Sequence, residues 1–382
     1  MLQKIINGKI LSPEPLPEHY GLLINNDRIL EVGDQEAFPQ DIPTIDAAGR
    51  WVIPGLIDIH VHGGEGYDTM DAENEALAGM ARYVLSTGVT SFLPTTTAAS
   101  QQDVIEAISR IQAFSQPGDK ARVLGIHLEG PYLGHKHKGA QPEQHLRAAE
   151  PEEYLPWLDS GVVKLFTVAP EVEGVMGLIS TGTKKGVRFA VGHSSASYDT
   201  MIEAIERGLS QATHTFNGMP QLHHREPGVV GTVLTDPRVY AQIITDGIHL
   251  HPAIVDLVFK AKGTDRTVLI TDAIRAAGAH DGVHRLGDQV VTVTDGIART
   301  ATGSLAGSTL SMQQALRNTL QFTGRTLEEV LPSATRVAAE SIGMQDQIGA
   351  LKPGLKADIV LLDENLTPRL CLVAGKTVYQ NL

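Results

Sequence analysis

Two histidines end an apolar segment near the start of the chain. The stretch GLIDIHVHGG, residues 55–64, places His60 and His62 one residue apart, directly before two glycines. Residues i and i+2 of a strand point to the same side. We therefore expect both imidazoles to face one space, where they can share a metal ion. A packed core pair is the alternative, which the position at the end of a strand disfavours.

Polar residues end several other apolar segments in the same way. They are Glu129 in IHLEGP, His193 in AVGHSSA, His214 in QATHTFNGMP and Asp272 in LITDA. A parallel strand covered on both faces is apolar along its length. In parallel barrels the chemistry lies at the C-terminal ends of the strands. The shared position of these residues predicts one site.

Four histidines and a carboxylate form a ligand set typical of zinc and other divalent transition metals. Glu129, His193 and His214 can hold one ion and leave a position open for water. His60 and His62, with Glu129 as a bridge, can hold a second ion about 3.5–4 Å away. Each residue alone also has an ordinary structural explanation, such as a buried histidine bonded to the backbone. Their common placement favours the metal site.

The middle of the chain alternates short apolar runs with helical patterns. Helical periodicity covers 71–86, with Ala72 on its apolar face, and also 101–114 and 197–209. This alternation predicts an α/β fold, a (β/α)8 TIM-like barrel over residues 54–344. An open doubly wound sheet is the alternative, although no Gly-x-Gly-x-x-Gly follows the first strand. The expected strands are 56–62, 90–94, 123–128, 163–169, 187–192, 210–214, 241–246 and 267–271.

Both ends of the chain are rich in β-strand patterns. KIINGKIL carries an Asn-Gly turn at Asn7, and GLLINNDRILEVG carries a second turn near Asn26. Both are hairpin signals. We expect residues 1–53 and 345–382 to form one small β domain from both chain ends.

Composition and charge narrow the class of protein. No apolar run reaches the roughly 18 residues of a membrane span, and no signal peptide is evident. Cys371 is the single cysteine of the 382 residues, so an internal disulfide is excluded and a cytoplasmic protein is expected. The formal net charge of −13 argues against nucleic-acid and anionic-membrane partners. The negative net charge does not exclude a small anionic substrate, because binding one needs only a few cationic side chains at the site.

A set of motifs runs in order along the chain and carries a family resemblance. The motifs are PGLIDIHVHGG, HLEGPYL, KGAQP, VGHSSA, THTFNGMP, HHREPG, ITDGIHL, LITDA and GSLAGSTLSM. The chain resembles the amidohydrolase superfamily and, within it, the N-acetylglucosamine-6-phosphate deacetylases, over essentially its whole length. The N-acetylgalactosamine-6-phosphate deacetylases have nearly the same motifs.

The resemblance implies a (β/α)8 barrel with a small β-sandwich, usually in a homodimer. It also implies metal-dependent hydrolysis of the acetamide of a 6-phosphorylated amino sugar. Glu129, His193 and His214 would be the primary ligands, and His60 and His62 would hold a second ion. Zinc is the expected metal, and iron, cobalt or manganese also suit the ligands.

The resemblance implies roles for further residues. Asp272 would be the catalytic acid/base, taking a proton from the attacking water and delivering it to the departing nitrogen. A set of substrate contacts is implied at Ala140, Gln141, Asn217, Gly218, Arg225, Asp246, His249, Leu305, Ala306, Gly307 and Ser308.

Three positions of the family pattern need separate comment in this chain. Many members have a histidine after KGA, where this chain has Gln141, whose amide donates a hydrogen bond but cannot carry a proton. His135, His137 and His249 are possible substitutes. Arg225 is the candidate phosphate contact, contributed to the neighbouring subunit's site, and a surface ion pair with Glu226 is the alternative. A bridging carboxylated lysine is not expected, because Lys164 lies near the start of its strand.

Other functions are weighed against this one. The N-acetylgalactosamine 6-phosphate substrate is the nearest alternative. Another amidohydrolase, acting on a cyclic amide or an N-acyl amino acid, would need neither Arg225 nor the loop from Leu305 to Ser308. A non-catalytic binding or scaffold protein is disfavoured, because all the candidate ligands and Asp272 are present.

Overall fold

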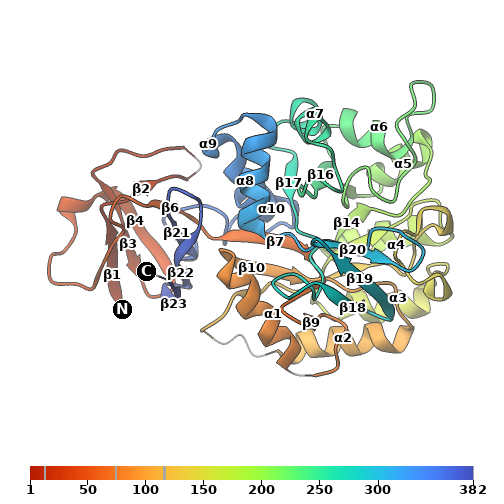
Figure 1. The fold of residues 1–382 in the computed structure, drawn as a ribbon, viewed down its shortest axis with the longest axis horizontal. Coiled ribbons are helices and arrows are strands. Elements are labelled where there is room, and N and C mark those ends of the chain that lie inside the picture. The colour runs from red at the N-terminus through yellow and green to blue at the C-terminus, as the bar shows by residue number, and fades with distance from the viewer. Residues whose placement is uncertain (13, 74, 115–117, 382) are drawn as a thin grey trace.

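The computed structural model describes residues 1–12, 14–73, 75–114 and 118–381. Figure 1 shows two parts: β-sheets that contain both chain ends on the left, and an α/β body on the right. Within the described ranges, no helix is both long enough and apolar enough to cross a membrane.

Parallel strands form the centre of the α/β body. A three-stranded sheet has the order β11-β10-β7, and a six-stranded sheet runs from β12 to β17 in chain order. These strands are β7 (Leu56–Val61), β10 (Val89–Pro94), β11 (Arg122–Val123), β12 (Ile126–Glu129), β13 (Val163–Val168), β14 (Arg188–Val191), β15 (Leu209–Ala212), β16 (Tyr240–Ile243) and β17 (Thr267–Leu269).

Backbone pairing joins the two parallel sheets at both of their borders. A parallel bridge between Thr95 and His127 connects the end of β10 to β12, and a second bridge connects Val61 to Ala273, just beyond β17. The parallel sheet is therefore curled, and the segments beyond its first and last strands meet. The predicted α/β fold is confirmed in this form.

A buried carboxylate holds the border between β7 and β17. Oδ2 of Asp58 accepts a 2.6 Å hydrogen bond from the Thr271 hydroxyl, and Oδ1 accepts from the backbone N–H of His60 at 3.2 Å. Burial raises the pKa of Asp58 to about 6, although the bonds from Thr271 and His60 act in the opposite direction. Asp58 thus connects the strand that carries His60 to the segment that carries Asp272.

Helices cover the outer face of the curled sheet. In α2 (Gln101–Ala113) the buried residues Val104, Ala107, Ile108 and Ile111 recur at helical spacing, and the Ser100 side chain caps its first turn. The other helices are α1 (Glu75–Ser86), α3 (Pro151–Asp159), α4 (Val175–Lys184), α5 (Tyr198–Glu206), α6 (Gly228–Thr235), α7 (Pro252–Lys262), α8 (Met312–Thr323), α9 (Leu327–Val330) and α10 (Arg336–Ser341), with 3-10 turns at Gln35–Ala37, His135–His137, Glu143–His145 and Leu331–Ala334.

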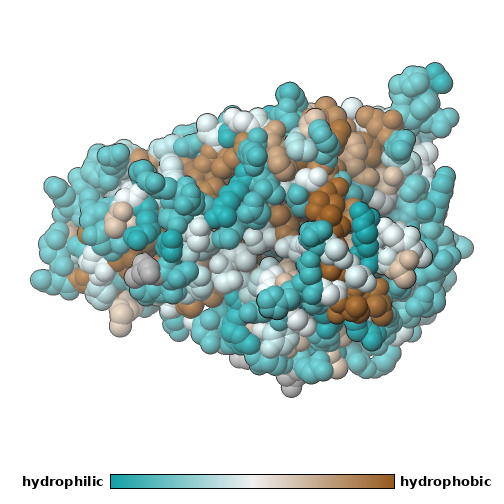
Figure 2. All heavy atoms as spheres, viewed as in Figure 1, coloured by the Kyte–Doolittle hydropathy of each residue, from teal (hydrophilic) through white to brown (hydrophobic). Residues whose placement is uncertain are grey.

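A small antiparallel sheet follows β17 and lies beside the ends of the parallel strands. It consists of β18 (Gly282–Leu286), β19 (Gln289–Thr294) and β20 (Ile297–Thr300). Its inner face packs Leu286 and Val291 against Ile274 and Ala276, two residues of the segment after Asp272. Its outer face exposes Val283 and Val290, and Figure 2 shows hydrophobic atoms where this sheet lies in Figure 1.

Strands from both ends of the chain form the remaining large sheets. One has the order β4-β3-β1-β5 and the other the order β2-β6-β21-β22-β23. A hydrophobic cluster between them includes Ile5, Ile24, Val52 and Leu372. The strands are β1 (Leu2–Ile6), β2 (Lys9–Ile10), β3 (Tyr20–Asn25), β4 (Arg28–Asp34), β5 (Thr44–Asp46), β6 (Trp51–Pro54), β21 (Ile359–Leu362), β22 (Pro368–Val373) and β23 (Lys376–Gln380), and the short pair β8 (Gly63–Gly64) and β9 (Tyr67–Asp68) lies beside the body.

Three local predictions are wrong. The turn at Asn7 does not close a hairpin, because β1 and β2 belong to different sheets, whereas the turn at Asn26 does join β3 to β4. The predicted strand 123–128 is divided into β11 and β12 at Gly125, whose φ of +145° breaks the ladder. The helix predicted over 71–86 begins at Glu75, and Ala72 is exposed before it.

We predict that Thr271→Val destabilises the fold in a pH-dependent way. The change removes the hydroxyl donor from buried Asp58, which should cost about 1–3 kcal/mol of the free energy of unfolding near pH 8, where Asp58 is ionised. The loss should be smaller near pH 5, because Asp58 is then mostly protonated and its neutral carboxyl group gains less from the Thr271 donor than the carboxylate does. Denaturant unfolding at the two pH values measures both.

Thr267→Val is the matched control for this prediction. It removes a hydrogen bond from the Thr267 hydroxyl, at the start of β17, to the carbonyl of Gly263 at the end of α7. No carboxylate is involved, so its effect should not change between the two pH values. An equal loss at both pH values for Thr271→Val would show that Asp58 is not the group being stabilised.

Candidate metal centre

Four histidines surround the carboxylate of Glu129 at the C-terminal ends of the parallel strands. The Nε2 atoms of His193 and His214 each lie 3.1 Å from Oε1 of Glu129. The Nε2 atoms of His62 and His60 lie 3.2 and 3.7 Å from Oε2. All five side chains are buried. Glu129 therefore turns one oxygen towards each pair of imidazoles.

These atoms form two groups that could each hold a metal ion. One group is His60, His62 and Glu129, and the other is Glu129, His193 and His214. The ligand atoms within each group lie within 4.8 Å of one another. The structure thus brings together the five residues that the sequence singled out as ligands, with Glu129 common to both groups.

The hydrogen bonds of the imidazoles suit metal binding. A backbone carbonyl only accepts, so a ring nitrogen bonded to one must carry a proton, and in the neutral ring the other nitrogen has the lone pair that can bind a metal. Metal-binding histidines are usually oriented in this way. Three of the four rings place Nδ1 on a carbonyl, in the pairs His62–Thr95 at 3.1 Å, His193–His137 at 2.9 Å and His214–Asn217 at 3.1 Å.

The charges of the site favour a bound cation. Burial opposes a charge on His60 and His62, but the carboxylates of Asp272 and Glu129 outweigh it and raise the pKa values to about 9 and about 10. Burial would raise the pKa of Glu129, yet the neighbouring imidazoles hold it well below its usual range. The two carboxylates thus keep their negative charge inside the protein, where it attracts positive charge.

Asp272 contacts both histidines of the His60 and His62 pair. Its Oδ1 is 3.2 Å from Nε2 of His60 and 3.1 Å from Nε2 of His62, and its backbone N–H donates to the His60 carbonyl at 2.9 Å. Burial would raise the pKa of Asp272, but the two histidines hold it far below its usual range. The carboxylate is therefore ionised and able to accept a proton.

Three of the site residues have a strained backbone. His193, His214 and Asp272 have φ angles of +49°, +30° and +50°, in the region that non-glycine residues occupy at a cost of about 1–2 kcal/mol each. Such residues cluster at functional sites, where the surrounding structure holds them. The turn away from the strand direction lets these side chains face the same space.

A cavity of about 210 Å³ opens onto this centre. Several residues predicted to contact substrate line it, together with His62, Glu129, His193, His214 and Asp272. These predicted contacts are Ala140, Gln141, Asn217, Gly218, His249, Leu305 and Gly307. Residues distant in the sequence thus converge on one space large enough for a small substrate.

Other predicted site residues lie behind this cavity. His60 is fully buried beneath it. Asp246 bonds through Oδ2 to Nδ1 of His249 at 2.6 Å. Ser308 donates its hydroxyl to the Thr271 carbonyl at 2.6 Å, and Ala306 is buried in the cluster beneath β18–β20. These residues support the ones that line the cavity.

Arg225 lies away from the cavity. It is exposed in the loop before α6, which projects from the body at the upper right of Figure 1. Its guanidinium contacts His224, with 2.7 Å between Nη1 and Nε2, and it lines a separate hollow with Lys136 and Ser195. The alternative considered for Arg225, an ion pair with Glu226, does not occur among the ion pairs of the described residues.

Three cavity residues were not predicted from the sequence. Gly139 lies in the same turn as Gln141, Ser304 directly precedes the predicted loop, and Leu286 ends β18. Proximity to KGAQP and GSLAGS could have suggested the first two. Nothing in the sequence indicates that a leucine of an antiparallel hairpin would reach the site. His135 is exposed and paired with Glu143, so its side chain takes no part here.

Lys164, the lysine of the fourth predicted strand, lies away from the histidine pairs. Lys164 donates its Nζ to the Gly161 carbonyl near the start of β13, which is the position that the sequence predicted for it. At the inner position further along this strand, Thr167 bonds to His127 at 2.7 Å and to Thr213 at 2.6 Å. The bridging carboxylate between the two histidine pairs is Glu129.

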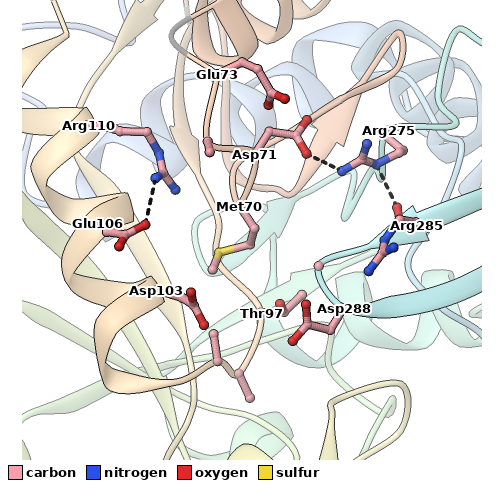
Figure 3. Close-up of a pocket in the computed structure, with 14 residues that line it drawn as sticks. Met70, Asp71, Glu73, Thr97, Asp103, Glu106, Arg110, Arg275, Arg285 and Asp288 are labelled. Atoms are coloured by element: carbon pink, nitrogen blue, oxygen red, sulfur yellow. Dashed lines mark hydrogen bonds and ion pairs between the residues drawn. The ribbon is translucent and has the colours of Figure 1, made fainter.

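A second cavity, of about 330 Å³, is lined in part by Thr97 and Ala98. Figure 3 shows that acidic side chains and arginines line it. Arg275 pairs with Asp71 at 2.6 Å and Arg110 with Glu106 at 3.9 Å. Both metal-capable groups of the described residues lie at the smaller cavity, so the smaller cavity is the candidate site.

The curled parallel sheet and the histidine and carboxylate cluster define a metal-binding α/β protein. The amidohydrolase family model matches residues 51–378. The chain therefore belongs to the amidohydrolase family, whose members are metal-dependent.

Individual relatives match nearly the full length. The chain is 36% identical to the N-acetylglucosamine-6-phosphate deacetylase of Lysinibacillus sphaericus, over 97% of this chain and 96% of that protein. It is 39% identical to the N-acetylgalactosamine-6-phosphate deacetylase of Escherichia coli, over 89% and 90% of the two chains. A solved structure of a mutant of the Mycobacterium smegmatis N-acetyl-D-glucosamine-6-phosphate deacetylase, in complex with N-acetyl-D-glucosamine-6-phosphate, has a TM-score of 0.90, with 32% identity and coverage of 100% and 99%.

We predict that substitutions in the cluster remove bound metal according to group membership. Glu129→Gln should lose all metal, because Glu129 belongs to both groups. His62→Asn should lose the ion of its own group and keep the other, reducing about two ions per chain to about one. Metal content after loading and gel filtration measures both.

His249→Asn is the control, because His249 lines the cavity outside both groups. It should retain the full metal content. A Glu129→Gln variant that binds as much metal as the unmodified protein would contradict the shared role of Glu129.

Proposed function

We propose that this chain hydrolyses the acetamide of N-acetylglucosamine 6-phosphate, giving glucosamine 6-phosphate and acetate. The observation that carries the proposal is the ionised Asp272 carboxylate, 3.1 and 3.2 Å from two Nε2 atoms of the metal-capable cluster, at a cavity of small-molecule size. The names of the full-length relatives support this substrate.

We also propose a closed (β/α)8 barrel over residues 54–344 and a small β-sandwich domain from 1–53 and 345–382. The pairing of the segments beyond β7 and β17 supports closure. The separate hydrophobic cluster between the two terminal sheets supports the second domain, whose last residue, Leu382, lies outside the described residues. The cavity then lies at the C-terminal face of the barrel, where barrel enzymes perform their chemistry.

The proposed mechanism assigns proton transfer to Asp272. Glu129 and the two histidine pairs would hold a divalent ion, which would supply Lewis acidity towards the acetyl carbonyl and the attacking water. Asp272 accepts the proton of the attacking water and then donates it to the sugar nitrogen, which leaves as a neutral amine. His60 and His62 hold the pKa of Asp272 below its usual range, which supports an ionised carboxylate as the proton acceptor.

His249 is the proposed donor to the substrate on the cavity wall. Burial opposes its protonation, but the bond to Asp246 outweighs this and raises the pKa of His249. With Nδ1 held by Asp246, a protonated ring presents an N–H from Nε2. Asn217 and Gly218, beside His214, are the proposed contacts to the sugar.

The proposed cofactor is zinc, with one or two ions per chain. The mixture of imidazole and carboxylate ligands suits zinc, and iron, cobalt and manganese also accept it. The cytoplasm is the proposed location, because a lone buried cysteine, Cys371, is typical of proteins of reducing compartments.

We propose that the enzyme is a homodimer in which Arg225 binds the phosphate of the substrate in the neighbouring subunit. Arg225 is not among the residues that line its own chain's cavity, and this supports the arrangement, as does its projecting loop. A guanidinium can bind phosphate through two parallel hydrogen bonds.

The second candidate substrate is N-acetylgalactosamine 6-phosphate. The 39% identity to a deacetylase of that sugar phosphate favours including it in any assay. Both substrates carry the same reacting acetamide and the same phosphate, so the proposed roles of Asp272 and Arg225 apply to both.

We predict that the enzyme releases acetate from N-acetylglucosamine 6-phosphate and that Asp272→Asn lowers kcat by about 10²- to 10⁴-fold, because an amide cannot accept the proton. Acetate release measures the rate. Metal content must be the same in the variant for the comparison to isolate proton transfer. Faster release from N-acetylgalactosamine 6-phosphate would make that sugar phosphate the substrate instead. No release from either sugar phosphate by metal-loaded protein would refute the proposed function.

We predict that Arg225→Met lowers kcat/KM for the 6-phosphate by about 10- to 100-fold, because a charge-assisted bond contributes roughly 1.5–3 kcal/mol. Release from unphosphorylated N-acetylglucosamine should be unaffected. Arg238→Met is the control, because Arg238 is an exposed arginine paired with Asp236. In a mixed dimer of one Arg225→Met chain and one Asp272→Asn chain, one of the two sites has both Asp272 and the neighbour's Arg225. Mixing the two variants should therefore restore activity. Failure to restore it would place Arg225 outside the neighbouring site.

A further inference from the structure

We propose that Gln141 is a positioning residue that decides how Glu129 divides its two oxygens between the two histidine pairs. The resemblance assigns this position to the substrate. The geometry points to the metal centre instead. The inference deepens the proposed function and rests on it only in taking the two histidine pairs as metal sites.

The side chain of Gln141 is held at both ends. Its Oε1 accepts a 2.8 Å hydrogen bond from the backbone N–H of Ala98. Its Nε2 donates to Oε2 of Glu129, also at 2.8 Å. A backbone N–H can only donate and an ionised carboxylate can only accept, so the amide of Gln141 cannot flip. The residue is buried, which strengthens both bonds.

The bond to Glu129 acts on one oxygen and not on the other. Oε1 of Glu129 is 3.1 Å from the Nε2 atoms of both His193 and His214. Oε2 lies 3.2 Å from Nε2 of His62, and this is the oxygen that Gln141 contacts. A carboxylate oxygen has two lone pairs, so Oε2 can accept from Gln141 and still face the His60 and His62 pair.

A glutamate carboxylate needs such a partner to stay in place. The terminal torsion of a glutamate is broad, so rotamer preference alone does not fix the plane of the two oxygens. The backbone N–H of Glu129 donates to Thr96 but does not hold the carboxylate. Without the amide of Gln141, the carboxylate can turn Oε2 away from His62 while Oε1 remains with the other pair.

The loop that carries Gln141 is itself attached to the centre. The backbone N–H of Gln141 donates to the Lys138 carbonyl at 2.9 Å, and the His137 carbonyl accepts from Nδ1 of His193 at 2.9 Å. Gly139 has a φ of +57°, and a Cβ there would lie 3.4 Å from His193. One short turn therefore supports two ligands, His193 through its backbone and Glu129 through the side chain of Gln141.

The experiment counts and titrates zinc ions in the absence of substrate. Gln141→Met fills a similar volume with no hydrogen-bonding amide. We expect the unmodified protein to bind two Zn²⁺ ions per chain, and Gln141→Met to bind the first unchanged and the second about 10- to 100-fold more weakly. Competition with a chelator of known zinc affinity gives the two constants.

Gln242→Met is the matched control. Gln242 is another buried glutamine with one amide bond, from Nε2 to Oε1 of Gln211 at 2.9 Å, and it contacts neither histidine pair. It should bind both ions as the unmodified protein does. A thermal unfolding scan of both variants shows that each is folded before metal is counted.

The outcomes separate this inference from the proposed function. If Gln141→Met keeps both zinc affinities and changes only KM for the sugar phosphate, Gln141 is a substrate contact and the inference is wrong. If the unmodified protein binds a single zinc ion, there is no division to control and the inference is also wrong. Selective loss of the second ion supports it, even if the loaded enzyme releases no acetate, which would overturn the proposed function alone.

Discussion

The arrangement of the site depends on one buried carboxylate shared by four imidazoles. Glu129 turns Oε1 to His193 and His214 and Oε2 to His62 and His60. A buried charge is costly unless it is paired, and here a carboxylate without cationic partners would be strongly destabilising. The surrounding elements therefore have to bring one nitrogen of each of the four rings to within 3.7 Å of the two oxygens.

The curled sheet meets this constraint by placing strand ends side by side. Asp58 and Thr271 join the first strand of the sheet to the segment after the last, which brings Asp272 to His60 and His62. The carbonyls of Thr95, His137 and Asn217 fix three of the rings with Nε2 inward. Left-handed backbone at His193, His214 and Asp272 is part of the cost of this convergence.

Much of the site could be predicted because its ligands end apolar runs. His60, His62, Glu129, His193 and His214 are conspicuous for that reason, and the structure brings them together. The contribution of Leu286 could not be predicted, because it depends on how an antiparallel hairpin packs over the strand ends. The hairpin expected at Asn7 failed because a turn signal does not say whether the strands on either side pair with each other. The early start expected for α1 failed because Ala72 fits the helical period but lies outside the helix.

The dependence on Glu129 is tested by measuring acetate release from N-acetylglucosamine 6-phosphate by metal-free protein as zinc is added back in steps. We expect no release without metal, a rise in rate as the sites that share Glu129 fill, and no recovery in Glu129→Gln. Release that is independent of added metal, or the same in Glu129→Gln, would contradict a reaction that depends on this shared carboxylate.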